Sequence, residues 1–366
     1  MKTKILIAAA LLVCLCAACR SRSGAKGQDS PCEGNFSGET FQSIMEQLDL
    51  KNEECHCDFV SQQAISGETG LSVWLIPQVT DSETDEYDNS SFSLDCRVLL
   101  VDNETEKIVS RYDEPYIFDS DAYRLMGLSI DTVFYGLSDK VSAFAVNASY
   151  ASGSRVNSTG NTSASLFIRQ GDMLKKILDY EIHQYQTESG AEDAYYHNSV
   201  REKLIISDKK TNGLHDILFR IDSTHTNYIK VGDDLEEETA IETDFRFFRY
   251  NGSEYKEGAA DNSVIYEKYE VEIGESEEYF YFGKTLNQVY EILKNKESVF
   301  KNDLMPELPE EETRYETEEG EYTYKVSYFP DENGSWWIWI EGDYGGTTLH
   351  ITEKAKFTSL TIANTD

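Results

Sequence analysis

Alternating apolar and polar positions dominate the chain after residue 58. Because the side chains of a strand point to opposite faces in turn, this period of two is typical of half-buried strands. Leu71–Ile76 predicts one strand, which should stop at Pro77 because proline removes a ladder hydrogen bond. Phe92–Val101 followed by Lys107–Val109 predicts a hairpin. Residues 79–91 are polar and acidic and predict an exposed loop.

Two segments instead repeat apolar residues at the spacing of a helix. Residues 39–50 predict an amphipathic helix with Thr40 as N-cap, and residues 285–293 predict a second helix. Thr285 and Gln288 have the spacing of a capping box, in which each side chain accepts a backbone N–H from the other residue.

The middle of the chain contains two segments of the same layout, about 80 residues apart. Residues 164–175 and residues 244–256 each read as a strand, a glycine turn and a second strand, and Asn251-Gly252 is a strong hairpin signal. Another strand pair precedes each segment. The pattern predicts antiparallel β repeats that pack together in a sandwich or in a propeller-like arrangement.

A different composition begins near residue 260 and predicts a second domain. The second helix is followed by expected strands over 322–329, 335–341 and 347–352, joined by Asn-Gly and Gly-Gly turns. We therefore expect a mainly β fold with a β-rich domain over 39–259 and a small C-terminal α+β domain over 260–366.

The chain is strongly acidic, with 33 Lys and Arg against 67 Asp and Glu and a formal charge of −34. Such a surface repels phosphate backbones, which argues against nucleic acid as a partner. It also argues against a basic face lying on an anionic bilayer. Cations, cationic peptides and basic protein patches remain as partners. The plainest interpretation is that the charge keeps an exposed β protein soluble.

The first 18 residues have the parts of a secretory signal, with Lys2 and Lys4 before an apolar run over 5–15. This run is shorter than the about 20 residues that a membrane-spanning helix needs. Ala17-Ala18-Cys19 resembles the bacterial lipobox, although the usual leucine is displaced by one position. The resemblance implies a bacterial lipoprotein that acyl chains on Cys19 anchor in the cell envelope, at the outer membrane or the surface.

Ordinary cleavage to a soluble secreted protein is the alternative to lipidation. Residues 19–38 are rich in Ser, Gly and other small polar residues without apolar periodicity. They predict a flexible tether between the lipid and the folded part of the chain.

Four cysteines, Cys32, Cys55, Cys57 and Cys96, would remain in an exported chain. An even number in an oxidising compartment predicts up to two disulfides. Their pairing stays open, except that Cys55 and Cys57 are too close to pair comfortably in a strand. The alternative is a zinc or copper site at Cys55-His56-Cys57, but no second Cys/His cluster follows it.

The segment around Asp208, Asn212 and Asp216 resembles the calcium loop of FG-GAP β-propeller repeats. The resemblance implies that these side chains could bind calcium. Lys210, however, stands where the family has an acidic ligand, and its charge would repel the ion. The simpler interpretation is a strand, a turn at Asn212-Gly213 and a second strand.

Motifs for catalysis or nucleotide binding do not stand out. The chain contains neither a Gly-x-Ser-x-Gly elbow nor a His-Glu-x-x-His helix. Gly283-Lys284-Thr285 precedes a predicted helix as a phosphate loop would, but Glu278 replaces the leading glycine, so we exclude a nucleotide. Carboxylates are so abundant that a glycosidase-type pair can be neither located nor dismissed from sequence.

Trp336-Trp337-Ile338-Trp339-Ile340 places aromatic side chains on both faces of one expected strand, with Trp337 and Trp339 sharing a face. Either the helix and a neighbouring domain cover both faces, or Trp337 and Trp339 form an exposed platform for a sugar ring or a protein. The sequence thus predicts a non-enzymatic envelope lipoprotein with a binding or scaffolding role and no cofactor. A surface hydrolase that cleaves carbohydrate with a carboxylate pair is the alternative.

Overall fold

The described part of the chain is mainly β, as predicted. Besides strands it contains two α-helices, α1 (Gly38–Leu48) and α2 (Leu286–Asn295), and two single-turn 3-10 helices. Among these residues, neither helix has the length and apolar character needed to span a bilayer. The computed structural model describes residues 32, 36–65, 70–84, 86, 90–131, 133–154, 156–189, 195–231, 234–259, 264–270, 275–295, 304–319, 322–331, 333–342 and 345–365.

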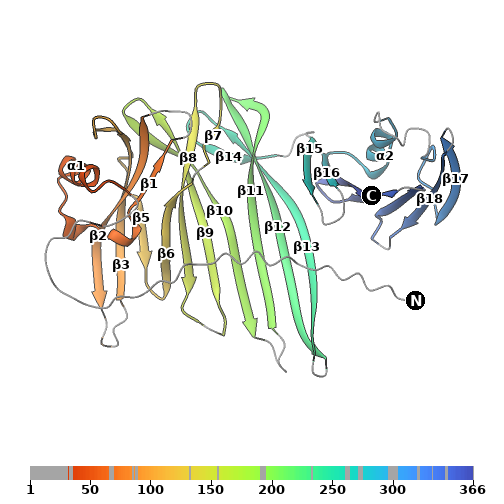
Figure 1. Cartoon of the computed structure of the whole chain (residues 1–366), viewed down its shortest axis with the longest axis horizontal. Coiled ribbons are helices and arrows are strands. Elements are labelled where there is room, and N and C mark those ends of the chain that lie inside the picture. Colours follow the sequence, from red (N-terminus) through yellow and green to blue (C-terminus); the bar gives the residue numbers. More distant parts are fainter. Residues whose placement is uncertain are drawn as a thin grey trace.

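The strands belong to two sheets, one of 14 strands and one of seven (Figure 1). The two sheets divide between Gly258 and Val264, where the sequence changes composition. The first sheet contains β1 (Ser61–Ala64), β2 (Leu71–Thr84), β3 (Ser90–Asp102), β4 (Ile108–Arg111), β5 (Ile117–Ser120), β6 (Tyr123–Ile130), β7 (Tyr135–Gly136), β8 (Ser142–Ser152), β9 (Thr159–Gln170), β10 (Met173–Ser189), β11 (Tyr195–Thr211), β12 (Leu214–Val231), β13 (Asp234–Tyr250) and β14 (Tyr255–Gly258).

The large sheet folds over itself into three packed layers. The first layer holds β1–β5, the second holds β6 and β8–β10, and the third holds β11–β14. Successive residues of the second layer alternate between two cores, as the pleat requires. Phe144 and Phe167 pack with Val73 of the first layer, whereas Leu166 packs with Phe219 of the third layer. The second layer is therefore apolar on both faces.

The two predicted repeats lie in different layers of this one sheet. The segment 164–175 forms the β9–β10 hairpin around Gly171, and the segment 244–256 forms the β13–β14 hairpin around Asn251 and Gly252. Their strands pack face to face across a shared core, which is a sandwich arrangement. Separate propeller blades are not formed, because β10 and β11 pair directly and join the layers.

Helix α1 covers the outer face of the first layer, where Phe41 and Ile44 pack on Trp74. The predicted helix is thus confirmed, but the prediction of Thr40 as its N-cap is wrong, because the N-cap is Ser37. The hydroxyl of Ser37 accepts the backbone N–H of Thr40, while the Thr40 hydroxyl donates to Glu106.

Strand β2 runs through Pro77 and into the predicted loop, so both expectations for this stretch are wrong. Pro77 lies opposite Cys96. The backbone N–H of Cys96 points away from β2 and donates to the carbonyl of Tyr116, so this pair needs no ladder hydrogen bond from Pro77. The polar residues up to Thr84 pair with the start of β3, so this stretch is a strand, but residues 80–84 are exposed as predicted.

One disulfide joins Cys32 to Cys57, and Cys55 and Cys96 are buried free thiols. The second predicted disulfide does not form because the first layer separates the two thiols. Cys55 packs with Trp74 on the side of α1, whereas Cys96 packs with Val73 on the opposite face. The metal alternative at Cys55-His56-Cys57 is not formed either, since Cys57 is bonded to Cys32.

The second sheet has helix α2 on one face, with Val289 and Leu293 packed on Ile338 and Ile340. The predicted capping box is present: Thr285 N–H donates to Gln288 Oε1, and Gln288 N–H donates to Thr285 Oγ1. The strands, in sheet order, are β15 (Val264–Glu270), β16 (Glu275–Phe282), β21 (Phe357–Thr365), β20 (Gly345–Glu353), β19 (Trp336–Gly342), β18 (Tyr322–Pro330) and β17 (Thr313–Glu319).

The other face of the second sheet packs on the third layer of the first. Phe245 of β13 is 2% exposed and lies 4.8 Å from Phe280, 5.1 Å from Phe282 and 5.2 Å from Phe357, measured between ring centroids. In Figure 1 the small sheet accordingly lies beyond β13, at the opposite end of the elongated molecule from α1.

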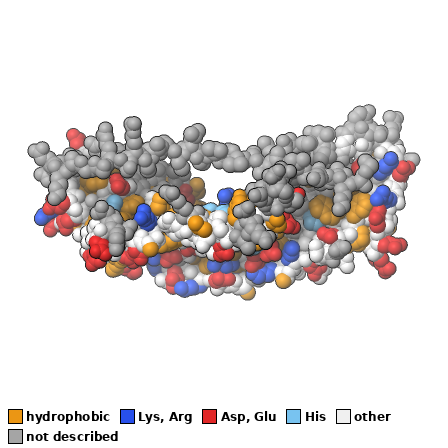
Figure 2. Space-filling model, turned by 90° about the horizontal axis from the view of Figure 1, so that it is seen from below, with side chains coloured by type: hydrophobic (Ala, Val, Ile, Leu, Met, Phe, Trp, Pro, Cys, Tyr) orange, Lys and Arg blue, Asp and Glu red, His pale blue; other side chains and the backbone are white. Residues whose placement is uncertain are grey.

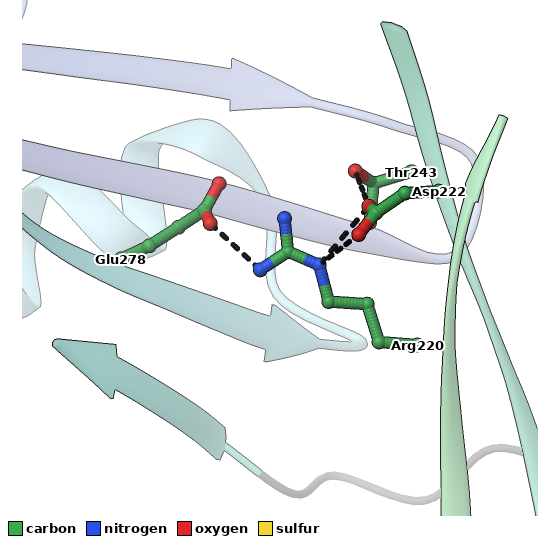
Figure 3. A network of polar contacts seen from close by, with 4 residues as sticks. All are labelled: Arg220, Asp222, Thr243 and Glu278. Atoms are coloured by element: carbon green, nitrogen blue, oxygen red, sulfur yellow. Dashed lines mark hydrogen bonds and ion pairs between the residues drawn. The ribbon is translucent and has the colours of Figure 1, made fainter. Parts of the chain in front are cut away.

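An ion-pair network borders this aromatic contact (Figure 3). Arg220 Nε donates to both carboxylate oxygens of Asp222 at 3.0 Å, and its Nη1 donates to Glu278 of the second sheet at 2.9 Å. Thr243 Oγ1 donates to Asp222 at 2.7 Å, which holds that carboxylate in place. The network therefore links the two sheets through an arginine whose side chain is only 16% exposed.

Candidate binding surface

Two tryptophans of β19 face away from helix α2 and are open to solvent. Trp337 is 37% exposed and Trp339 is 43% exposed, whereas Ile338 and Ile340 between and beside them are buried. Strand alternation places both indoles on one face, as the sequence predicts. Large apolar side chains on an exposed sheet face indicate a binding surface when they form a continuous patch.

Trp337 is the centre of a row of flat side chains that crosses three strands. It lies directly opposite Phe329 of β18 and His350 of β20. The imidazole of His350 stacks on the indole, with ring centroids 3.8 Å apart and an interplanar angle of 11°. His350 Nε2 and the hydroxyl of Thr352 share a hydrogen bond of 3.1 Å.

Trp339 stands in the next row, between small polar neighbours. Ser327 and Thr348 are its cross-strand partners, so the indole rises above both adjacent strands. Its ring also contacts Phe329 at 4.7 Å, and the Arg314 guanidinium lies 5.1 Å from the Phe329 ring on the far side of the row. We call Phe329, Trp337, Trp339 and His350 the aromatic platform.

The neighbouring domain covers only one end of this sheet face. The row of Trp337 and His350 continues to Thr361 and then to Glu278, the partner of Arg220. The β16–β21 end of the face is therefore buried at the domain contact, while the β18–β20 end is open. The expectation that both faces of the sheet are covered is therefore correct at the β16–β21 end and wrong at the β18–β20 end.

Burial lowers the pKa of His350 below its usual value of 6.5, and the carboxylate of Asp331 opposes this shift. Burial therefore favours the neutral form of the stacked imidazole. A neutral ring beside Trp337 gives the platform an uncharged, flat and partly polar surface, although the chain as a whole is acidic.

The residues of the FG-GAP-like loop do not face one another in a common site. Asn212 and Gly213 form the tight turn between β11 and β12, with φ of 49° and 86°. The Asn212 amide donates to the carbonyl of Tyr250, and Asp216 lies 3.9 Å from the Arg249 guanidinium. Asp208 is exposed before the turn. In the part of the chain that the structure describes, three or more His, Cys, Asp or Glu side chains nowhere gather as metal ligands would.

Carboxylates do line one cleft of about 650 Å³ between the layers, but each of them is engaged. Glu202 accepts from Arg246 at 2.7 and 2.5 Å, Asp179 pairs with Lys176 at 2.9 Å, and Glu181 accepts from Asn161 at 3.1 Å. Burial raises the pKa of Glu202, while Arg246 opposes this shift. A glycosidase needs one free acid and one free base or nucleophile facing the bond, so this cleft gives the hydrolase alternative no specific support.

Cys19, the signal segment and most of the tether lie outside the described residues. Sequence reasoning found the two tryptophans of the platform but missed Phe329 and His350, which are far from them in the chain. Only the register of β18, β19 and β20 brings these rings together. The alternation within each predicted strand was the available signal, and it could not supply the pairing.

No protein-family model, curated protein or solved structure matches this chain. Its function is therefore inferred from the chemistry of its surfaces.

Proposed function

We propose that this chain is an exported, lipid-anchored, non-enzymatic binding protein whose C-terminal domain holds a glycan on the aromatic platform. The signal segment and Cys19 support export and anchoring in a bacterial envelope. The observation that carries the binding role is the exposed pair Trp337 and Trp339, at 37% and 43% exposure, on an otherwise well-packed sheet.

The chemistry of the platform favours a sugar. Flat aromatic rings offer apolar faces to the C–H groups of a pyranose, and the hydroxyls of Ser327, Thr348 and Thr352 lie beside or next to these rings as hydrogen-bonding partners. The small neighbours of Trp339 leave room for a sugar ring against its face. Rigid β-strands hold the indoles in place, which lowers the entropic cost of binding.

The test is a glycan array of neutral and acidic oligosaccharides, followed by calorimetry with each hit. Trp339→Ala should weaken binding at least ten-fold, equivalent to about 1.4 kcal/mol. Tyr196→Ala is the matched control, because Tyr196 is an aromatic residue of similar exposure, 42%, in the other domain. Equal binding by both variants, or platform-dependent capture of a protein instead of a glycan, would refute the proposal.

Anchoring is tested separately by mass spectrometry of the protein extracted from membranes. We expect an N-terminal Cys19 that carries acyl chains. A mature chain that begins elsewhere, or that retains residues 1–18, would contradict the anchor without affecting the glycan-binding test.

A further inference from the structure

Part of strand β10 has a free edge. One edge of β10 pairs with β9 from Met173 to Gln186. On the other edge, β4 pairs only at Met173, and β11 pairs only from His183 onward. Within the described strands, residues 174–182 therefore have no ladder partner on that edge, over a length of about 30 Å.

The edge is free because β10 and β11 separate into different layers. Before His183, β10 packs with the second layer, and Leu178 and Tyr180 face a core that Phe219 and Phe248 close from the third layer. Register shifts at Lys176/Leu178 and Glu181/His183 bend the strand away from β11. The separation is thus held by a packed core.

Two cavities lie along this edge and share Lys176. One, of about 450 Å³, extends past Met173 to Ser253 and Glu254, and the other, of about 650 Å³, extends from Tyr116 to Arg246. The segment 112–118 of the first layer forms one wall and side chains of the third layer form the other. We call this combined space the edge groove.

The lining of the edge groove carries more acidic than basic side chains. Its basic side chains are engaged, Lys176 with Asp179, Lys175 with Ser253 and Arg246 with Glu202. Two of its acidic side chains also have partners beside the groove, Asp113 in Arg111 and Glu254 in Lys256. Acidic lining residues outnumber basic ones two to one, and they are Asp113, Glu114, Asp179, Glu181, Glu202 and Glu254.

We propose that the edge groove binds a cationic peptide in extended conformation, which adds a strand to β10. At a free edge, the backbone N–H and C=O groups of every second residue point outward from the strand. Another extended chain can form hydrogen bonds with all of these groups one after the other. The excess of carboxylates over cations in the lining favours Lys and Arg side chains over acidic ones. This site is separate from the aromatic platform and does not depend on it.

The test uses the full mature chain and a labelled ten-residue peptide of alternating Lys and Val, followed by fluorescence polarisation. We expect saturable binding that is at least ten-fold weaker for the alternating Glu and Val peptide. Two further peptides are methylated on the backbone nitrogens of either the lysines or the valines. Methylation should weaken binding at least ten-fold in the peptide in which it removes the N–H groups that face β10, and much less in the other peptide.

Matched charge reversals locate the site. Glu114→Lys with Glu254→Lys should weaken binding at least ten-fold, whereas Glu237→Lys with Glu238→Lys, on the exposed part of β13, should change it less than three-fold at the same net charge. Thermal melts confirm that both double variants fold. Trp339→Ala should bind the peptide as the unmodified chain does, which separates this test from that of the platform.

Hydrogen exchange gives a second measurement, in which peptide should slow amide exchange within residues 174–182. The proposal is overturned if binding does not saturate, if both methylated peptides bind like the parent, if both double variants lose affinity equally, or if protection appears at another sheet edge instead.

Discussion

Loss of the Cys32–Cys57 disulfide should destabilise the first domain by about 3.5 kcal/mol. The two residues are 25 positions apart in the chain. In the chain-entropy treatment, closing a loop of this length removes about 12 cal/mol/K from the unfolded ensemble, which gives the quoted free energy at 25 °C. For a domain of roughly 200 residues this corresponds to a fall in melting temperature of about 7–14 °C.

The assay is calorimetry of the mature chain beside Cys57→Ser and the Cys32→Ser/Cys57→Ser double variant. The C-terminal domain provides an internal reference, because it holds three of the four tryptophans, Trp336, Trp337 and Trp339. The midpoint temperature of its unfolding, followed by tryptophan fluorescence, should fall much less than that of the calorimetric transition of the first domain.

Reduction of the unmodified chain should reproduce the variant, and reductant should have no effect on the double variant. Melting temperatures that agree within about 2 °C in all samples would refute the reasoning. An equal shift of the fluorescence transition would also contradict it, since the disulfide would then act through the domain contact.

Three further outcomes follow from the same contacts. Burial raises the pKa of the Cys55 thiol to about 12 and also raises the pKa of the Cys96 thiol. Iodoacetamide at pH 8 should therefore label neither thiol in the folded chain and both in urea. Equal labelling rates in the folded and the urea-unfolded chain would contradict the burial of these thiols. The His350 pKa lies below 6.5, so the unfolded chain takes up its proton more readily, and stability of the C-terminal domain should fall as pH drops below 6.5. NMR titration measures this pKa, and His350→Gln should remove the dependence. Phe245→Ala should cost about 3–5 kcal/mol at the domain contact and increase the radius of gyration in solution scattering. Ile241→Ala, 66% exposed on the same strand, should do neither, and an unchanged radius for Phe245→Ala would show that the contact does not fix the domains.

On the face seen in Figure 2, the acidic side chains are spread out and do not form one patch. Figure 2 shows Asp and Glu side chains across the visible face, with Lys and Arg among them. This distribution fits the role of charge in keeping an exposed β protein soluble. The structure thus supports specific roles only where acidic residues coincide with another feature, as in the edge groove.

The sequence pattern was sufficient to predict those elements that depend only on residues close together in the chain. Apolar spacing located both helices, and the side chains of Thr285 and Gln288 set the start of α2, because a capping box needs only residues three positions apart. Alternation located the strand of Trp337, and the Asn212-Gly213 pair located the turn between β11 and β12. The change of composition near residue 260 marked the place where the two sheets separate.

Pairing between distant segments was decided by tertiary structure. Nothing near Pro77 in sequence shows that Cys96 directs its N–H toward Tyr116, and this geometry allows β2 to continue. Likewise, Cys32, Cys55 and Cys57 all lie on the α1 side of the first layer, and only the folded chain shows that Cys57 is the one bonded to Cys32. Alternation gives the two faces of a strand, but not its neighbours or which of its faces another domain covers. For that reason the sequence alone placed Trp337 and Trp339 together, while only the folded sheet showed that they are exposed and that β10 has a free edge.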